Sequence, residues 1–107
     1  ILELYEKDAI GYMMSCNYYP KPKNYKVKAK ENTRLSAHTD VSLFTTFPFG
    51  IAKGFSYLKE NKPIALGNKE KTLVFNGYFS EFITNGKIKA LNHQVELPKN
   101  LDSDFNF

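Results

Sequence analysis

Short runs of alternating apolar and polar residues cover most of the chain, and glycine, proline and asparagine separate them. This alternation is typical of half-buried strands, and it predicts strands at residues 41–47, 54–58, 64–66, 71–75 and 87–97. A turn is expected at 60–63, and a short helical turn between the Asn-Gly pairs at 76–77 and 85–86. The pattern therefore predicts a mainly all-β fold, an antiparallel sandwich or barrel.

The first residues have a different period. Leu2, Tyr5, Ala9 and Tyr12 recur at helical spacing, which predicts a helix over about residues 1–13. A strand-like run at 14–19 follows and stops before two prolines. At 107 residues the chain is at most one domain, 1–107, with the sheet core at about 14–107. Because it begins with Ile1 and ends on an interrupted strand pattern, we expect a piece of a longer polypeptide.

The charge of the chain does not indicate a nucleic-acid partner. The net charge of +4 is carried by lysine, and Arg34 is the only arginine, whereas readers of nucleic acids generally use arginine forks or clustered basic faces. Five lysines lie between residues 21 and 30. They form either a basic lip that attracts an acidic substrate or a solvated edge that discourages strand pairing, and the second interpretation is favoured.

The cysteine content and hydropathy favour a cytoplasmic protein. Cys16 is the only cysteine, so no internal disulfide is possible and a reducing compartment is the simpler expectation. No apolar run approaches the length of a membrane span, so no membrane association is expected.

His38 and Asp40 lie two residues apart, at a spacing that places both side chains on one face of a strand. His93 is the only other histidine. Two imidazoles and one carboxylate on one face of an iron ion leave the other coordination positions open, which is the facial triad of non-haem Fe(II) oxygenases. The alternative is that His38 and Asp40 cap a turn and His93 packs against a strand, because His-x-Asp is a short and common motif.

Five stretches of the chain form a pattern when they are taken in order. They are Asn17-Tyr18-Tyr19-Pro20, His38-Thr39-Asp40, Gly54-Phe55-Ser56-Tyr57, Leu73-Val74-Phe75-Asn76-Gly77, and Thr84-Asn85-Gly86 continuing to Asn92-His93-Gln94-Val95. His93, the third candidate ligand, follows Asp40 by 53 residues. With these stretches the chain resembles the iron(II)- and 2-oxoglutarate-dependent dioxygenases, in the branch that includes isopenicillin N synthase.

The resemblance implies a double-stranded β-helix (jelly roll) that holds Fe(II) through His38, Asp40 and His93. It also implies 2-oxoglutarate as cosubstrate, O2 and a small organic substrate as partners, and succinate and CO2 as coproducts. Asn17 and Tyr19 match positions that help to hold 2-oxoglutarate in some members. Their alternative role is to satisfy local backbone groups at a strand end.

One departure from the family concerns the cosubstrate. The family normally has Arg-x-Ser about ten residues after the distal histidine, and its guanidinium pairs with the far carboxylate of 2-oxoglutarate. Here the chain reads Leu101-Asp102-Ser103-Asp104. Either the arginine lies beyond Phe107 or this protein has replaced it, and Arg34 precedes the metal motif. An Fe(II) oxidase that does not use 2-oxoglutarate and a non-catalytic jelly-roll binding domain are the competing hypotheses.

The phenylalanines near the expected metal site have two possible roles. They line a dry substrate pocket or belong to the core, and the core is the expectation for at least half of them. The four residues are Phe44, Phe47, Phe75 and Phe79.

Overall fold

The computed structural model describes residues 3, 6–7, 11–18, 33–51, 54–66 and 70–97. Its elements, in chain order, are β1 (Thr33–His38), β2 (Phe44–Phe47), β3 (Phe55–Lys59), β4 (Lys62–Ala65), β5 (Leu73–Asn76), α2 (Tyr78–Ile83) and β6 (His93–Glu96). The mainly all-β class predicted from the alternating pattern is confirmed. No helix in these ranges is long and apolar enough to cross a bilayer.

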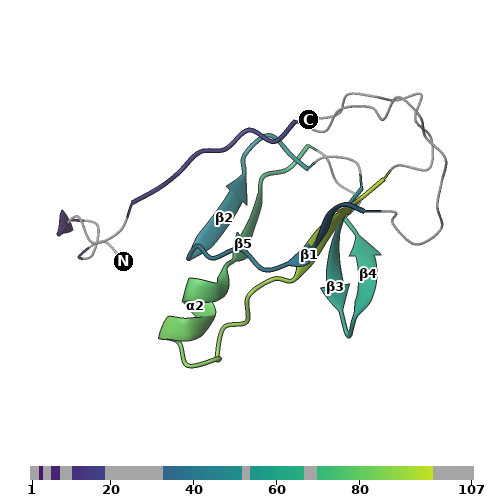
Figure 1. Cartoon of the computed structure of the whole chain (residues 1–107). Coiled ribbons are helices and arrows are strands. Elements are labelled where there is room, and N and C mark those ends of the chain that lie inside the picture. The colour runs from purple at the N-terminus through teal and green to yellow at the C-terminus, as the bar shows by residue number, and fades with distance from the viewer. Residues whose placement is uncertain are drawn as a thin grey trace.

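The strands form two antiparallel sheets (Figure 1). The larger sheet has the order β1-β6-β3-β4, and the smaller one pairs β2 with β5. Strand β6 lies between β1 and β3 and so pairs with strands that are distant in sequence, whereas β3 and β4 are consecutive. This arrangement is an incomplete jelly-roll core, as the family resemblance implied.

The hydrophobic core lies where the two sheets meet. Phe55 and Val95 come from the larger sheet and Phe75 from the smaller one, and all three are buried. The ring of Phe47 lies 5.7 Å from that of Phe55 and 5.8 Å from that of Phe75, so the aromatic side chains join the sheets. Ile51 is also buried, and the partly buried residues packed around this cluster are Leu35, Phe47, Leu66, Leu73 and Leu91.

Of the four phenylalanines near the expected metal site, two are in the core and two are exposed. Phe47 and Phe75 belong to the core. Phe44 lies three residues before Phe47, which places it on the opposite face of β2, and it is 49% exposed. Phe79 on α2 is also exposed. Neither Phe44 nor Phe79 therefore lines an enclosed pocket in the described part of the chain.

The N-terminal helix is shorter than predicted. Glu3 and Glu6 are helical, and the Lys7 amide donates to the Glu3 carbonyl at 3.2 Å. Residues 11–18 have no regular secondary structure, so neither the end of the predicted helix nor the strand-like run that follows it is observed there. Gly11 disfavours helix, and Tyr12, Met13 and Met14 are exposed, so packing within the described residues does not stabilise a helix there. The five lysines of 21–30 lie outside the described residues.

The turn predicted at 60–63 is tighter than expected. Glu60 and Asn61 have φ values of 51° and 62°, and they form the two-residue hairpin turn between β3 and β4. Lys62 and Pro63 consequently belong to β4. Proline is tolerated there because β4 is an edge strand of the larger sheet.

The strand predicted over 87–97 is limited to β6. The residues before it are held by side-chain hydrogen bonds instead of a strand ladder. Gly86 turns the chain with a φ of 77°, and the Thr84 hydroxyl accepts the Ile88 amide at 3.0 Å. The alternation of apolar and polar residues does not show whether backbone groups are hydrogen-bonded in a strand ladder or to side chains.

The first residues of α2 are fastened to the loop that follows β1. The amides of Gly77 and Tyr78 donate to the Leu43 and Asp40 carbonyls at 2.9 and 2.6 Å, and the Ser80 hydroxyl donates to Leu43 at 2.6 Å. The loop carbonyls thus satisfy amides that have no partner within the helix. This close approach requires glycine at 77, because a Cβ there would overlap the carbonyl of Ser42.

We expect Gly77→Ala to lower the free energy of unfolding by about 1–3 kcal/mol, the usual cost of forcing extra atoms into a packed site. Chemical denaturation of the two proteins measures the difference. Gly11→Ala is the matched control, since no atom lies within 4 Å of a Cβ built there. Equal stability of Gly77→Ala and the unmodified protein would contradict the close contact between loop and helix.

Candidate metal centre

Three potential metal ligands lie together at one end of the β1–β6 pair. Nε2 of His38 is 3.3 Å from Oδ1 of Asp40, and Nε2 of His93 is 3.6 Å from the same oxygen. The two imidazole ring centroids are 4.4 Å apart. The candidate ligand atoms of the three residues all lie within 4.8 Å of one another, and no other such group occurs in the described ranges.

Strand register brings the two histidines together. In the β1–β6 pair His38 is opposite His93, and Leu35 is opposite Val95. Three steps along β1 therefore match two steps along β6, which is an irregularity of the bulge type. In a regular strand Leu35 and His38 would point to opposite faces. The bulge allows Leu35 to pack on the core while His38 lies beside the buried His93.

Asp40 reaches the site by a different route from the one predicted. The two-residue spacing suggested that His38 and Asp40 share a face of one strand, but β1 ends at His38 and Asp40 lies in the following loop. The hydrogen bond from the Tyr78 amide to the Asp40 carbonyl holds this loop against α2. The position of the carboxylate therefore depends on a tertiary contact and not on strand pleating.

Each imidazole is oriented by a hydrogen bond between its Nδ1 and the backbone carbonyl two residues earlier. Nδ1 of His38 lies 2.8 Å from the Ser36 carbonyl, and Nδ1 of His93 lies 3.0 Å from the Leu91 carbonyl. A carbonyl oxygen can only accept, so each Nδ1 carries the proton and donates it. Each Nε2 is left on the side of Asp40, and a histidine that donates from Nδ1 can bind a metal through Nε2.

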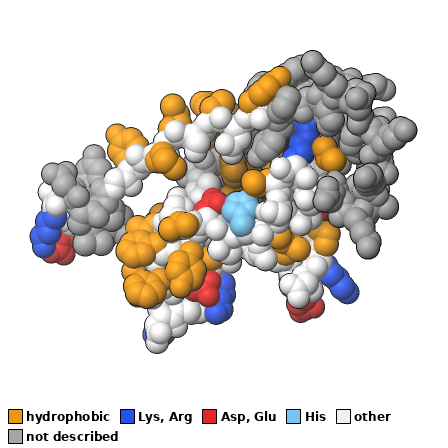
Figure 2. Space-filling view, in the orientation of Figure 1, with side chains coloured by type: hydrophobic (Ala, Val, Ile, Leu, Met, Phe, Trp, Pro, Cys, Tyr) orange, Lys and Arg blue, Asp and Glu red, His pale blue; other side chains and the backbone are white. Residues whose placement is uncertain are grey.

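The site is buried on one side and open on the other. His93 is 3% exposed, and its ring stacks on that of Phe55 with a centroid distance of 5.4 Å. The centroid of the Phe75 ring lies 4.9 Å from that of His93. The side chains of His38 and Asp40 are 36% and 26% exposed. Figure 2 shows a histidine beside an acidic side chain near the middle of one face of the molecule. A small molecule can therefore approach the group from solvent.

The donor set fits a divalent transition metal. Ligand atoms at about 2.1 Å from an ion and at right angles to each other lie about 3 Å apart. The two Nε2–Oδ1 distances of 3.3 and 3.6 Å are slightly longer and would need only small side-chain movements. Two imidazoles and one carboxylate are the ligands of a non-haem Fe(II) centre with open positions.

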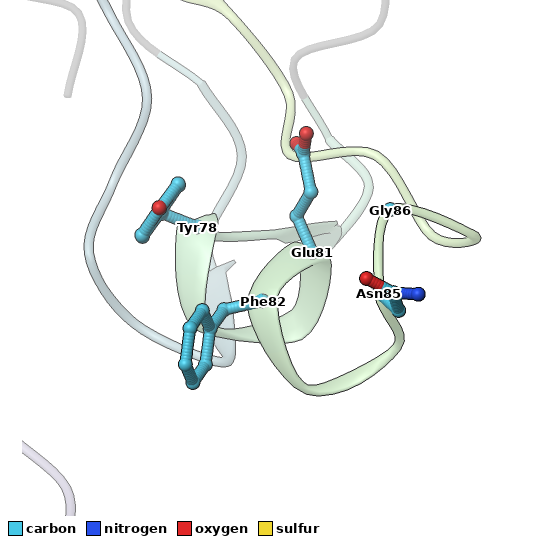
Figure 3. A pocket seen from close by; sticks show the side chains of 5 residues that line it. All are labelled: Tyr78, Glu81, Phe82, Asn85 and Gly86. Atoms are coloured by element: carbon cyan, nitrogen blue, oxygen red, sulfur yellow. The ribbon is translucent and has the colours of Figure 1, made fainter.

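A separate hollow of about 320 Å³ lies on α2 and the turn after it, lined by Tyr78, Glu81, Phe82, Asn85 and Gly86 (Figure 3). The side chains around it point in different directions, and the Glu81 carboxylate points toward the segment that follows Gly86. That carboxylate accepts the Ala90 amide at 2.8 Å and pairs with Lys89. Glu81 therefore has a structural role, and the hollow presents no converging set of polar groups.

Glu81 supports the metal centre indirectly, because it anchors the segment that leads to His93. Glu81 accepts the Ala90 amide, and the amide of the next residue, Leu91, donates to the Asn76 carbonyl at 3.0 Å. The Leu91 carbonyl in turn accepts from His93. The hydrogen bond from Ala90, assisted by Lys89, lowers the pKa of Glu81 below its ordinary value against an opposing effect of burial.

Comparison with known families identifies the chain. Residues 10–103 match the model of the 2OG-Fe(II) oxygenase superfamily. The match covers most of the chain, and the protein belongs to this superfamily. Comparisons with curated proteins and with solved structures gave no significant match.

The predicted cosubstrate residues are not joined to the metal centre in the described structure. Asn17 is exposed in an irregular segment, and in the described ranges no hydrogen bond links it to His38, Asp40 or His93. Tyr19 lies outside the described residues. Arg34 is half-buried on β1, four residues before His38.

Residues that orient the candidate ligands were not found by sequence reasoning. The carbonyls of Ser36 and Leu91 act through the backbone, which leaves no side-chain signal. Thr45 donates to the second oxygen of Asp40 at 2.5 Å. It lies five residues after Asp40 inside a strand-like run, where threonine is an ordinary strand residue.

We expect Glu81→Gln to reduce stability at neutral pH. Glutamine can still accept the Ala90 amide, but it loses the charge that interacts with Lys89. A carboxyl group with a lowered folded-state pKa contributes stability fully above its unfolded pKa and loses that contribution as the pH falls through the folded value. The difference in unfolding free energy should therefore disappear at acid pH.

Denaturation curves over a range of pH test this expectation. Glu60→Gln is the control, since Glu60 is exposed at the hairpin turn. A stability difference for Glu81→Gln that stays constant from neutral to strongly acid pH would show that its charge has no part in the effect.

Proposed function

We propose that this protein uses Fe(II) held by His38, Asp40 and His93, together with 2-oxoglutarate and O2, to oxidise a small organic substrate. The observation that carries the proposal is the convergence of two histidine Nε2 atoms on one carboxylate oxygen. Membership in the 2OG-Fe(II) oxygenase superfamily supports the metal and the cosubstrate. The isopenicillin N synthase-like branch stays a prediction from sequence resemblance.

The bound iron with its cosubstrate would supply the oxidation of a C–H bond, with succinate and CO2 as coproducts. The protein's own groups prepare the site for it. The two Nδ1 hydrogen bonds orient the imidazoles so that both Nε2 atoms lie on the side of Asp40, where they would donate lone pairs to the ion. Asp40 contributes the negative charge, and the rings of Phe55 and Phe75 exclude water from the buried side of His93.

Asn17 and Tyr19 remain our candidates for binding 2-oxoglutarate, on the basis of their match to the family pattern. We also retain the expectation of a cytoplasmic location without a nucleic-acid partner, from the single cysteine and the lysine-based charge. Iron(II) is stable in a reducing compartment, so this location would suit the proposed centre.

The second candidate is an Fe(II) oxidase that does not use 2-oxoglutarate. It is favoured by one observation, the acidic and small residues at 102–104 where the family normally has Arg-x-Ser. The far carboxylate of 2-oxoglutarate needs a cationic partner, and arginine offers two parallel donors to it. The same three metal ligands would serve either reaction.

Asp40→Ala should weaken the binding of Fe(II) by more than about 100-fold, because loss of an outer partner alone typically costs about 10–100-fold. The fold should survive, since the contact between the loop and α2 uses the backbone carbonyl of Asp40 and not its side chain. Anaerobic Fe(II) titration measures the affinity, and circular dichroism checks the fold. Glu60→Ala, at an exposed turn, is the control. A folded Asp40→Ala protein with unchanged affinity would refute the assignment of the carboxylate.

The cosubstrate is tested by calorimetry of the iron-loaded protein with 2-oxoglutarate under nitrogen, followed by measurement of succinate after O2 is admitted. We expect binding and O2-dependent succinate, and neither with Asp40→Ala. Tyr19→Phe should weaken the binding by roughly 0.5–1.5 kcal/mol if its hydroxyl makes one ordinary hydrogen bond. The neighbouring Tyr18→Phe, at an exposed residue, is the matched control.

The possible outcomes separate the two candidate functions. Iron binding without 2-oxoglutarate binding, but with O2 consumption on a suitable substrate, would favour the oxidase. Absence of iron binding by the unmodified protein would remove both enzymes and leave a binding domain.

A further inference from the structure

The two oxygens of the Asp40 carboxylate have different surroundings. Oδ1 faces both histidines, whereas Oδ2 lies 2.5 Å from the hydroxyl of Thr45. Ser42 adds a second step, because its hydroxyl lies 3.0 Å from the hydroxyl of Thr45. A chain of hydrogen bonds therefore leads to one oxygen of the candidate ligand and leaves the other oxygen facing the histidines.

The direction of this chain follows from the chemistry of the groups. The carboxylate can only accept, so the single proton of the Thr45 hydroxyl is donated to Asp40. Ser42 must then donate to Thr45, whose oxygen accepts. Hydrogen bonds to an ionised carboxylate are shorter and stronger than those between neutral groups. This bond accordingly fixes the rotation of the Asp40 side chain.

The strand pairing makes Thr45 a rigid donor. Thr45 lies opposite Phe75 in the β2–β5 ladder, and paired residues share a face of the sheet. Phe75 is buried against His93, so Thr45 is on the side of β2 that faces the metal centre. Thr46, the next residue, is exposed and lies opposite the exposed Val74 on the other face.

We infer that Thr45 is a positioning residue that restricts Asp40 to one metal bond, through Oδ1. This inference rests on the proposed function, since it assumes that Asp40 is a ligand. A carboxylate with both oxygens free can bind an ion through both and occupy an additional coordination position. By holding Oδ2, Thr45 keeps that position open for cosubstrate or O2. The coordination number of the metal then depends on a hydroxyl that does not itself bind the metal.

The test replaces iron by Co(II), whose visible absorption depends on the number and arrangement of its ligands. The full chain and its Thr45→Val variant are titrated with Co(II), and both affinity and spectrum are recorded. Valine has nearly the shape of threonine but donates no proton. We expect a changed spectrum and an affinity lower by about 10–100-fold, the usual effect of removing an outer-shell partner.

Two further variants show whether a change arises from the hydrogen bond. Thr45→Ser keeps the hydroxyl and should restore the spectrum and most of the affinity. Thr46→Val makes the same substitution on the exposed face of β2 and should match the unmodified protein in both measurements. A general loss of strand stability would affect Thr45→Ser or Thr46→Val as well, whereas loss of the Asp40 contact affects only Thr45→Val.

The outcomes also distinguish this inference from the proposed function. If the unmodified protein binds Co(II) and Thr45→Val gives the same spectrum and affinity, the positioning role is refuted and the metal centre stands. If the unmodified protein does not bind Co(II), the proposed function fails, and the inference fails with it.

Discussion

The pairing of β1 with β6 is the constraint on which the metal centre depends. It places His38 opposite His93 and gives the two imidazoles a common side. The bulge in β1 lets the strand keep Leu35 on the core as well. Strand β6 also pairs with β3, so His93 lies on an inner strand with a paired strand on each side. The position of His93 is consequently part of the sheet itself.

The third candidate ligand depends on the smaller sheet and on α2. Asp40 lies in a loop whose carbonyls accept the first amides of α2, and its carboxylate accepts from Thr45 on β2. The centre therefore lies where the two sheets meet, and the aromatic contacts that join the sheets also enclose His93. Packing of the core and geometry of the site are consequences of the same contacts. A disturbance of the contact between this loop and α2 would displace Asp40, whereas His93 is held by its neighbours in the larger sheet.

The cosubstrate is the part of the proposed reaction with the least support from this chain. The metal ligands are present and converge, while the usual arginine does not follow His93 at the expected distance. Metal binding and cosubstrate binding are thus separable questions for this protein. The geometry of the three ligands bears on metal binding. Cosubstrate binding requires a cationic partner for the far carboxylate of 2-oxoglutarate, and none of the three ligands can be that partner.

The sequence by itself determined the class of fold and the identity of the three candidate ligands. Alternation of side chains is a local property, so it indicated most strands, and only two histidines were available. The argument for placing His38 and Asp40 on one strand face was wrong, because the strand ends at His38. Only the tertiary structure decided the bulge, the loop contact with α2 and the role of Thr45. These features join residues that are distant in the sequence or act through backbone groups, and neither kind of interaction leaves a periodic pattern in the chain.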